Sequence, residues 1–342
     1  MPLRSSRIPA VPFPVAFFAL LLFTLTAQAR QTPGPLADTA WLADNLDNVV
    51  VLDVRTAPES FTQKQAPSAA AVNPCGAGKK QSLEEMVAGH IPGAALVPWK
   101  DVRADVKEGG IELKGMLLPQ PAFDRLMKQS GVSNDSAVVI VGNGESEMDA
   151  LVAARLYWMM KYYGHDDVAL LDGGTKQWMA ENRPMEYGES RPRRGRYRAA
   201  AQRPEILATA DDVAAAIDDD GVQILDVRNT EDYVGLTYSP KLTQPDRKGH
   251  IPTAKLWPIG TQVNTQGIAR FYPVDEIRKV AELMGVDPQA PTVTYCWSGG
   301  QGALSWFVLH ELLGNEQAKL YDGSMNEWVK DPSRPLVTMS MQ

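Results

Sequence analysis

Cys296 is the residue in this sequence with the clearest capacity for chemistry. It follows an apolar, β-branched run at residues 291–295 that predicts a strand. Residues 303–313 have apolar side chains at helical spacing, and Gly314 is placed to end that helix. The cysteine therefore lies in a short loop between a strand end and a helix start.

Such a loop favours a negative charge at its centre. Its backbone N–H groups curl inward, and the dipole of the following helix adds partial positive charge. Gly299, Gly300 and Gly302 permit the tight curvature and a close approach of the backbone to the sulfur. We therefore expect Cys296 to be a reactive thiolate, although most cysteines after strands are small buried apolar residues.

Composition narrows the function classes. The chain has 342 residues, enough for two domains, and a net charge of −7, which argues against a nucleic-acid-binding footprint. Its two cysteines and four histidines fall in no ligand-like spacing, so no metal site and no cofactor are expected.

Residues 1–29 have the pattern of a signal peptide. Arg4 and Arg7 form a basic start, residues 15–25 are apolar, and Ala27-Gln28-Ala29 is a small-residue cleavage site. The apolar run is too short to span a bilayer, which needs about 20 residues. We expect a mature chain from Arg30, free of the membrane, in the periplasm.

Four blocks of the sequence occur twice in the same order, which indicates two copies of one domain. The pairs are residues 50–55 with 223–228, 89–94 with 249–254, 137–142 with 291–296, and 171–178 with 321–328.

Apolar strands alternate with helical stretches in each copy. This alternation predicts an α/β fold of two tandem domains, each a mainly parallel sheet with helices on both faces. We expect a first domain at residues 36–184, a solvated linker at residues 185–204 rich in proline, glycine and arginine, and a second domain at residues 205–335.

The first copy lacks the thiol. Where the second copy has Cys296, the first has Gly142, followed by the carboxylates of Glu145, Glu147 and Asp149, which would repel an anion. An acid–base pair of Glu145 and Glu147 is one interpretation, and a plain surface loop is the other.

The duplicated LDVR strand, the GHIP block, the loop beginning CxSG and the DG…W block resemble the tandem-domain rhodanese sulfurtransferases over nearly the whole mature chain. The resemblance implies an inactive first domain and a catalytic second domain. It further implies a Cys296 persulfide that carries sulfur from thiosulfate or 3-mercaptopyruvate to cyanide or a thiol. By match to the family loop, the cradle around the sulfur comprises Cys296, Trp297, Ser298, Gly299, Gly300 and Gln301.

The sequence departs from the family pattern in its cations. The cysteine loop has none, and Asp232 stands where the family often has an arginine. The Ser-Gly pair is more similar to the mercaptopyruvate type of loop. Arg247, with Lys248, is our candidate for the anion contact, with a pair of solvated loop cations as the alternative.

Other residues have competing interpretations. Trp297 either walls the pocket or packs at the domain interface. His250, Asp226 and Arg228 have counterparts in the copy without a cysteine, which favours structural roles for all three. Cys75 is either a resolving thiol or an unpaired loop cysteine, since sequence spacing does not fix distance.

Two other functions compete with the enzyme. A relay module would carry sulfur to or from a periplasmic protein without turning over small donors, and the uncharged loop favours it. A cysteine phosphatase or arsenate reductase would need an arginine six residues after the nucleophile, where this chain has Gly302. We therefore exclude that last class.

Overall fold

The computed structural model describes residues 31–64, 87–108, 110–242 and 247–339. The proposed signal peptide and Cys75 lie outside these residues, so both remain predictions from sequence. Among the residues described, no helix is both long and apolar enough to cross a membrane.

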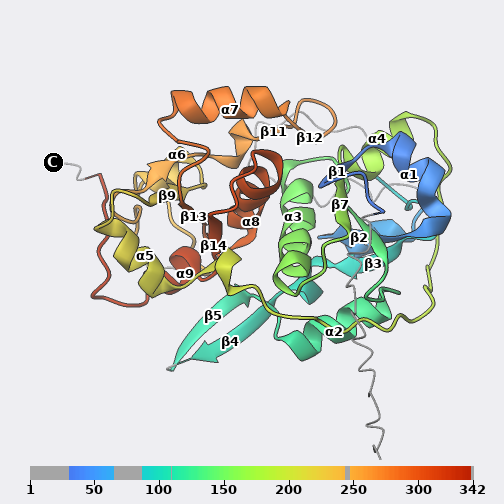
Figure 1. Cartoon of the computed structure of the whole chain (residues 1–342), viewed down its shortest axis with the longest axis horizontal. Helices are drawn as coiled ribbons and strands as arrows, with labels where there is room; N and C mark the ends of the chain where they lie inside the picture. Colours follow the sequence, from blue (N-terminus) through green and yellow to red (C-terminus); the bar gives the residue numbers. More distant parts are fainter. Residues whose placement is uncertain (1–30, 65–86, 109, 243–246, 340–342) are drawn as a thin grey trace, which may run out of the picture.

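Each half of the chain forms a parallel five-stranded sheet, and the two sheets have the same topology (Figure 1). The first has the order β1 (Leu36–Ala37), β7 (Val168–Leu171), β6 (Ala137–Val141), β2 (Val49–Arg55) and β3 (Ala95–Pro98). The second reads, from the equivalent edge, β8 (Leu207–Ala208), β14 (Ala318–Tyr321), β13 (Thr292–Tyr295), β9 (Gln223–Asp226) and β10 (Lys255–Leu256). The predicted duplication and the α/β class are therefore confirmed.

The central strands are apolar because helices cover both of their faces. β6, with the sequence AVVIV, is buried at every position, as expected for an inner parallel strand. The helices of the first domain are α1 (Thr39–Asn45), α2 (Gln120–Gln129), α3 (Glu147–Tyr162) and α4 (Gly174–Ala180). Those of the second are α5 (Ala210–Ile217), α6 (Thr230–Tyr233), α7 (Val274–Leu283), α8 (Gly300–Phe307) and α9 (Ser324–Trp328).

Helices α3 and α8 lie side by side between the two sheets and join the domains (Figure 1). α3 is buried around nearly its whole circumference, because one side faces its own sheet and the other faces α8. The ring of Tyr157 meets that of Phe307 edge to face, with centroids 4.8 Å apart. The helix begins at Gly300, three residues before the predicted start at Ala303. After Phe307 it continues as one π-helical turn, Val308–Leu312.

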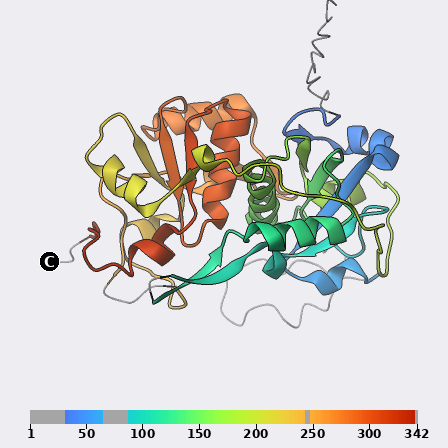
Figure 2. The same cartoon turned by 60° about the horizontal axis from the view of Figure 1, so that its bottom comes forward.

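Each domain extends a small antiparallel ladder toward the other. In the first domain, β4 (Ala104–Glu108) and β5 (Ile111–Met116) form a hairpin that runs beneath the second domain in both views (Figures 1 and 2). In the second domain, β11 (Val263–Asn264) pairs with β12 (Arg270–Phe271). Both ladders follow the edge strand of their sheet, β3 or β10, so they occupy equivalent places in the duplication.

The segment expected to be a solvated linker packs against the first domain instead. Tyr197 is 1% exposed, and its ring lies edge to face against Phe123 of α2. The backbone N–H of Gly195 donates to the carbonyl of Lys128. Within this arginine-rich stretch, Tyr197 provides the apolar contact, and its backbone N–H donates to the carbonyl of Val132. Most other residues of the segment stay exposed or half-buried, as a solvated linker would be.

Candidate active site

Cys296 follows β13 directly, at the carboxyl edge of the second sheet, where ligands bind in parallel α/β folds. Its side chain is 2% exposed. Gly299, just before α8, has φ of +74°, and a Cβ there would lie 2.3 Å from Oδ1 of Asp322. Only glycine fits this point of the loop, because a side chain would meet both a strained backbone and a carboxylate.

Ser324, the first residue of α9, hydrogen-bonds the backbone of the cysteine loop. Its Oγ accepts the backbone N–H groups of Cys296, at 3.1 Å, and of Gly299, at 3.2 Å. The same hydroxyl donates to the carbonyl of Tyr321 at 2.8 Å. Two of the loop donors are thus engaged within the protein, and the first turn of α8 supplies the N–H groups that have no acceptor in their own helix.

The Cys296 side chain opens onto a cavity of about 290 Å³. Both domains line it: Trp99, Arg103, Glu147, Met148 and Leu151 come from the first domain, and Ile259, Cys296, Trp297, Ser298, Gly300 and Gln301 from the second. The structure therefore brings Cys296 together with four of the other loop residues proposed from sequence. Gly299, the remaining loop residue, does not line the cavity.

Trp297 walls this cavity and is also fixed within its own domain. Its indole Nε1 donates to Oδ2 of Asp232 at 2.9 Å, and the guanidinium of Arg228 lies 4.4 Å from the ring centroid. Trp297 is therefore a cavity wall, and its packing partners belong to the second domain. Asp232, at the position where an arginine is often found in the proteins that the sequence resembles, therefore orients this tryptophan.

Arg103 is the cation of the cavity, and it comes from the domain that lacks the cysteine. The guanidinium stacks over Trp99 at 4.5 Å from the ring centroid, and its buried Nε has no hydrogen-bond partner among the described residues. Burial, and then repulsion from Arg155, lower the pKa of Arg103. An anion in the cavity would relieve both effects.

Arg103 is not predicted from the sequence, because the pattern places the expected anion contact near the GHIP block of the second copy. Arg103 instead lies in the first copy, between the short turn Trp99–Val102 that follows β3 and the start of β4. The aromatic–cation pair Trp99 and Arg103, four residues apart, was the available signal, although the copy that contains it has no cysteine in the equivalent loop.

Arg155 of α3 stands directly behind the loop. Its Nη1 donates to Oδ1 of Asp322 at 2.5 Å, and its Nε and Nη2, both buried, have no partner among the described residues. A Cβ on Gly299 would lie 2.7 Å from Nη1, which places this second guanidinium against the loop backbone. The N–H of Leu117 donates to the other oxygen of Asp322 at 2.7 Å. The first domain therefore holds the loop through one aspartate.

Arg247 is held elsewhere. Its Nη2 donates to the carbonyls of Asp331 and Arg334, each at 2.9 Å, and its Nε donates to the carbonyl of Val329 at 3.3 Å. These carbonyls belong to the chain that follows α9, and a guanidinium satisfies them well because it has several donors. Neither Arg247 nor Lys248 lines the Cys296 cavity, so this structure does not bring the proposed anion contact to the sulfur.

Glu145 and Glu147 do not form an acid–base pair. Oε1 of Glu145 accepts the N–H of Val87 at 3.0 Å, and its Oε2 accepts from Asn143. Glu147, at the start of α3, lines the Cys296 cavity, and burial raises its pKa. A carboxyl from the first copy thus reaches the site of the second copy.

The histidine and the LDVR residues have structural roles, as the duplication indicated. Nδ1 of His250 lies 2.8 Å from the carbonyl of Tyr233, and the two rings stack. Arg228 pairs with Asp226 at 2.5 Å, both side chains fully buried, and donates to the carbonyl of Gly249. In the first copy, Arg55 contacts Asp53 and the carbonyl of Gly89 in the same way.

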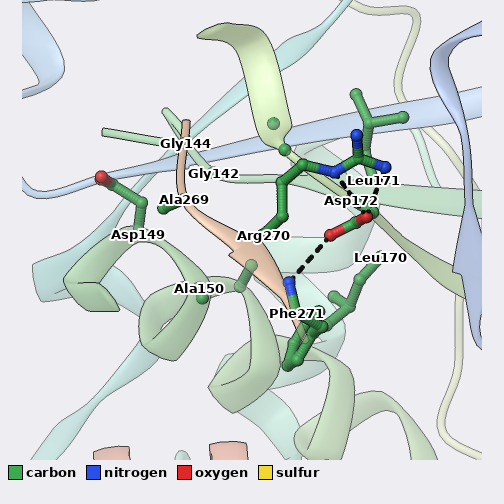
Figure 3. A pocket seen from close by; sticks show the side chains of 13 residues that line it. Gly142, Gly144, Asp149, Ala150, Leu170, Leu171, Asp172, Ala269, Arg270 and Phe271 are labelled. Atoms are coloured by element: carbon green, nitrogen blue, oxygen red, sulfur yellow. Dashed lines mark hydrogen bonds and ion pairs between the residues drawn. The ribbon is translucent and has the colours of Figure 1, made fainter. Parts of the chain in front are cut away.

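The equivalent site in the first copy is filled by the second domain. Ala269 donates its N–H to the carbonyl of Gly144. Asp172 accepts the N–H of Phe271 at 3.1 Å and pairs with Arg270 at 2.9 Å (Figure 3). About 20 Å³ of space remains, enough for a water molecule at most. Domain pairing therefore blocks one site and builds the walls of the other.

Among the residues described, no group of three or more histidine, cysteine, aspartate or glutamate side chains could hold a metal ion.

The fold and the site define a protein of two matched α/β domains, in which a single cysteine loop lies at the sheet edge of the second. The sequence matches the rhodanese-like domain family over residues 38–181 and again over 209–331, and the chain therefore belongs to the rhodanese family.

Similar proteins include putative thiosulfate sulfurtransferases and a sulfur carrier protein. The chain is 35% identical to a putative thiosulfate sulfurtransferase of Saccharopolyspora erythraea over 70% of this chain and 82% of that one. It is also 35% identical to the sulfur carrier protein TtuD of Thermus thermophilus, over 70% of this chain and 82% of the relative. By this homology the protein is a member of the sulfurtransferase family.

Solved structures show the same fold. SseA of Escherichia coli, described as a 3-mercaptopyruvate sulfotransferase, superposes with a TM-score of 0.65 and 24% identity, covering 85% of this chain and 98% of SseA. Tum1 of Saccharomyces cerevisiae superposes with a TM-score of 0.67 and 18% identity, covering 90% of this chain and 99% of Tum1.

Proposed function

We propose that the protein moves sulfane sulfur from thiosulfate or 3-mercaptopyruvate to cyanide or a thiol through a persulfide on Cys296. The observation that carries the proposal is the cavity in which Cys296 and Arg103 stand together. One supplies a nucleophile, and the other supplies a cation with an unengaged N–H.

The first half-reaction is an attack by the Cys296 thiolate on the outer sulfur of the donor. With thiosulfate, a new S–S bond forms while the donor S–S bond breaks, and sulfite leaves with the electron pair. With 3-mercaptopyruvate, a C–S bond breaks and the enolate of pyruvate leaves, to be protonated afterwards. Arg103 stabilises the anionic end of either donor, and the first-turn N–H groups of α8 stabilise charge at the loop.

In the second half-reaction, cyanide or a thiolate attacks the outer sulfur of the persulfide. The bond to Cys296 breaks, and its electron pair returns to the Cys296 sulfur. The acceptor leaves as thiocyanate or as a persulfide. No metal or cofactor takes part in this sequence of steps.

Intact-mass spectrometry tests the first half-reaction. After exposure to either donor, the protein should gain one sulfur, about 32 Da, and the Cys296→Ser variant should gain none. If the reduced protein gains no mass with either donor, the proposal fails. The more effective donor identifies the subclass.

A sulfur relay without turnover of small donors is the second candidate, and the similarity to a sulfur carrier protein supports it. Steady-state assays with cyanide or a simple thiol as acceptor separate the two. Multiple turnovers per protein molecule support the enzyme, whereas loading without turnover supports the relay.

A further inference from the structure

A second, larger cavity adjoins the Cys296 cavity. The reaction steps proposed above use only the smaller cavity, so they give the larger one no role. Its volume is about 920 Å³. Lining residues come from both domains: Lys100, Arg103, Asp105, Lys114, Gly115, Ser239, Pro240, Lys241, Leu242 and Ser298. Arg103 and Ser298 line both cavities, so the larger cavity leads to the cysteine loop.

The larger cavity is basic, although the chain as a whole is acidic. Lys100, Lys114 and Lys241 are exposed around it, and Arg103 lies where the two cavities meet. Asp105 is the one carboxylate among the described lining residues, and its Oδ1 already accepts the N–H of Gly115 at 3.0 Å. On a chain with a net charge of −7, such a cluster of cations creates a local positive field that attracts anions.

The larger cavity, at about 920 Å³, has more volume than a small sulfur donor would need. Thiosulfate and 3-mercaptopyruvate are small enough for the cavity beside Cys296, whose volume is about 290 Å³. The adjoining volume lies in the upper part of the range for sites that bind small organic ligands, about 300–1,000 Å³. Because the lysines come from the turn before β4, from β5 and from residues 239–242, they would contact a ligand at several separate points.

We propose that this basic cavity binds the sulfur acceptor, and that the acceptor is a low-molecular-weight thiol of peptide size with two or more carboxylates. The proposal rests on the proposed function and specifies its second half-reaction. The carboxylates contact Lys100, Lys114 and Lys241, while the thiol reaches past Arg103 and Ser298 toward the persulfide.

The step balances without a further reactant. The acceptor thiol ionises and releases its proton to solvent, and its sulfur forms a bond with the outer sulfur of the persulfide. The S–S bond to Cys296 breaks, the electron pair returns to Cys296, and the acceptor leaves as a persulfide.

A matched pair of thiols tests the contribution of the carboxylates. Glutathione and its diethyl ester share the same thiol, but the ester lacks both carboxylate charges. With protein already loaded with sulfur, glutathione should react at a concentration about tenfold lower than the ester requires. The advantage should shrink when sodium chloride is raised to about 0.5 M, because exposed ion pairs are screened. Equal reactivity of the two thiols would overturn the proposal.

The triple variant Lys100→Gln, Lys114→Gln, Lys241→Gln tests the site. Its KM for glutathione should rise about tenfold, while its rate with neutral 2-mercaptoethanol stays at the wild-type value. Lys107→Gln is the matched control, because Lys107 is exposed on the same hairpin and does not line the cavity. An unchanged KM in a triple variant that melts like the wild type would refute the site.

Binding of S-methylglutathione, measured by calorimetry on the unloaded protein, needs no chemistry at all. The wild type and Lys107→Gln should bind it, and the triple variant should bind it about tenfold more weakly. Absence of binding to the wild type, or equal binding to all three, would contradict the proposal. Failure of the donors to load Cys296 would instead refute the proposed function, and this binding measurement would still decide the site.

Discussion

Ser324 accepts the N–H of the catalytic candidate Cys296 at 3.1 Å while its own backbone has φ of +51°. The equivalent residue of the first copy is Gly174, where an added Cβ would lie 2.2 Å from the carbonyl of Gly142. A serine is thus accommodated only in the copy with the cysteine, where its hydroxyl also bonds Gly299. The strained serine orders the cysteine loop.

Ser324→Ala should therefore loosen the loop. Removal of the hydroxyl leaves two buried N–H groups without an acceptor, at a cost of about 1–3 kcal/mol in the free energy of unfolding. Urea denaturation measures this loss, and single-turnover loading of Cys296 should slow in parallel. A variant with wild-type stability and loading rate would show that the hydroxyl is dispensable.

Arg103→Gln should raise the KM for an anionic donor by about tenfold or more, because a hydrogen bond to a charged group contributes about 1.5–3 kcal/mol. Arg247→Gln provides the contrast. It should lower stability through the loss of three carbonyl contacts, and it should leave the KM unchanged. Steady-state kinetics and melting curves of both variants decide which arginine contacts the substrate, and the reverse pattern would restore Arg247 to that role.

Arg155→Met should destabilise the protein by about 3–5 kcal/mol, because it leaves the carboxylate of Asp322 buried without its ion partner. The double variant Arg155→Met, Asp322→Asn should recover part of that loss. Urea denaturation of the four proteins forms a double-mutant cycle. Additive losses would contradict a direct coupling between the domains through this pair.

Glu147→Gln should make the protein more stable at alkaline pH. Burial raises the pKa of Glu147 above its usual 4.5, so the folded chain binds more protons than the unfolded chain in the window above pH 4.5. Stability contributed by this group therefore falls as the pH rises through that window. Glutamine carries no charge at any pH, so the variant does not lose stability through ionisation of this buried position.

Melting temperatures measured at pH 4 and pH 8 check this sign. The Glu147→Gln variant should match the wild type at pH 4 and exceed it at pH 8, by no more than about 2–4 °C for a chain of this size. Glu282→Gln, at an exposed position on α7, should match the wild type at both values. A lower melting temperature for Glu147→Gln at pH 8 would contradict the prediction.

The duplicated blocks were sufficient to predict the fold, since LDVR and its repeat place β2 and β9 at equivalent positions in the two sheets. The cysteine loop was also predictable, because Cys296 and Gly299 are neighbours in sequence and the strand and helix on either side have clear periodicities. These are local signals.

The cations of the site were not predictable in this way. Arg103 and Arg155 reach the loop across the domain interface, from residues more than 130 positions away in sequence. Arg247 is near in sequence but is turned toward carbonyls that follow α9. Which arginine faces the sulfur depends on how the domains pack, and periodicity within one copy does not contain that information.

The filling of the first copy's site by Ala269, Arg270 and Phe271 makes the two domains depend on each other. The first copy has no cysteine at this position, and its site is closed by residues at and beside β12 of the second domain. The second domain in turn depends on the first for Trp99, Arg103 and Glu147, which line the cavity beside the Cys296 sulfur. Neither domain therefore has a complete, open site of its own, and the two would have to be kept together for the cysteine loop to work.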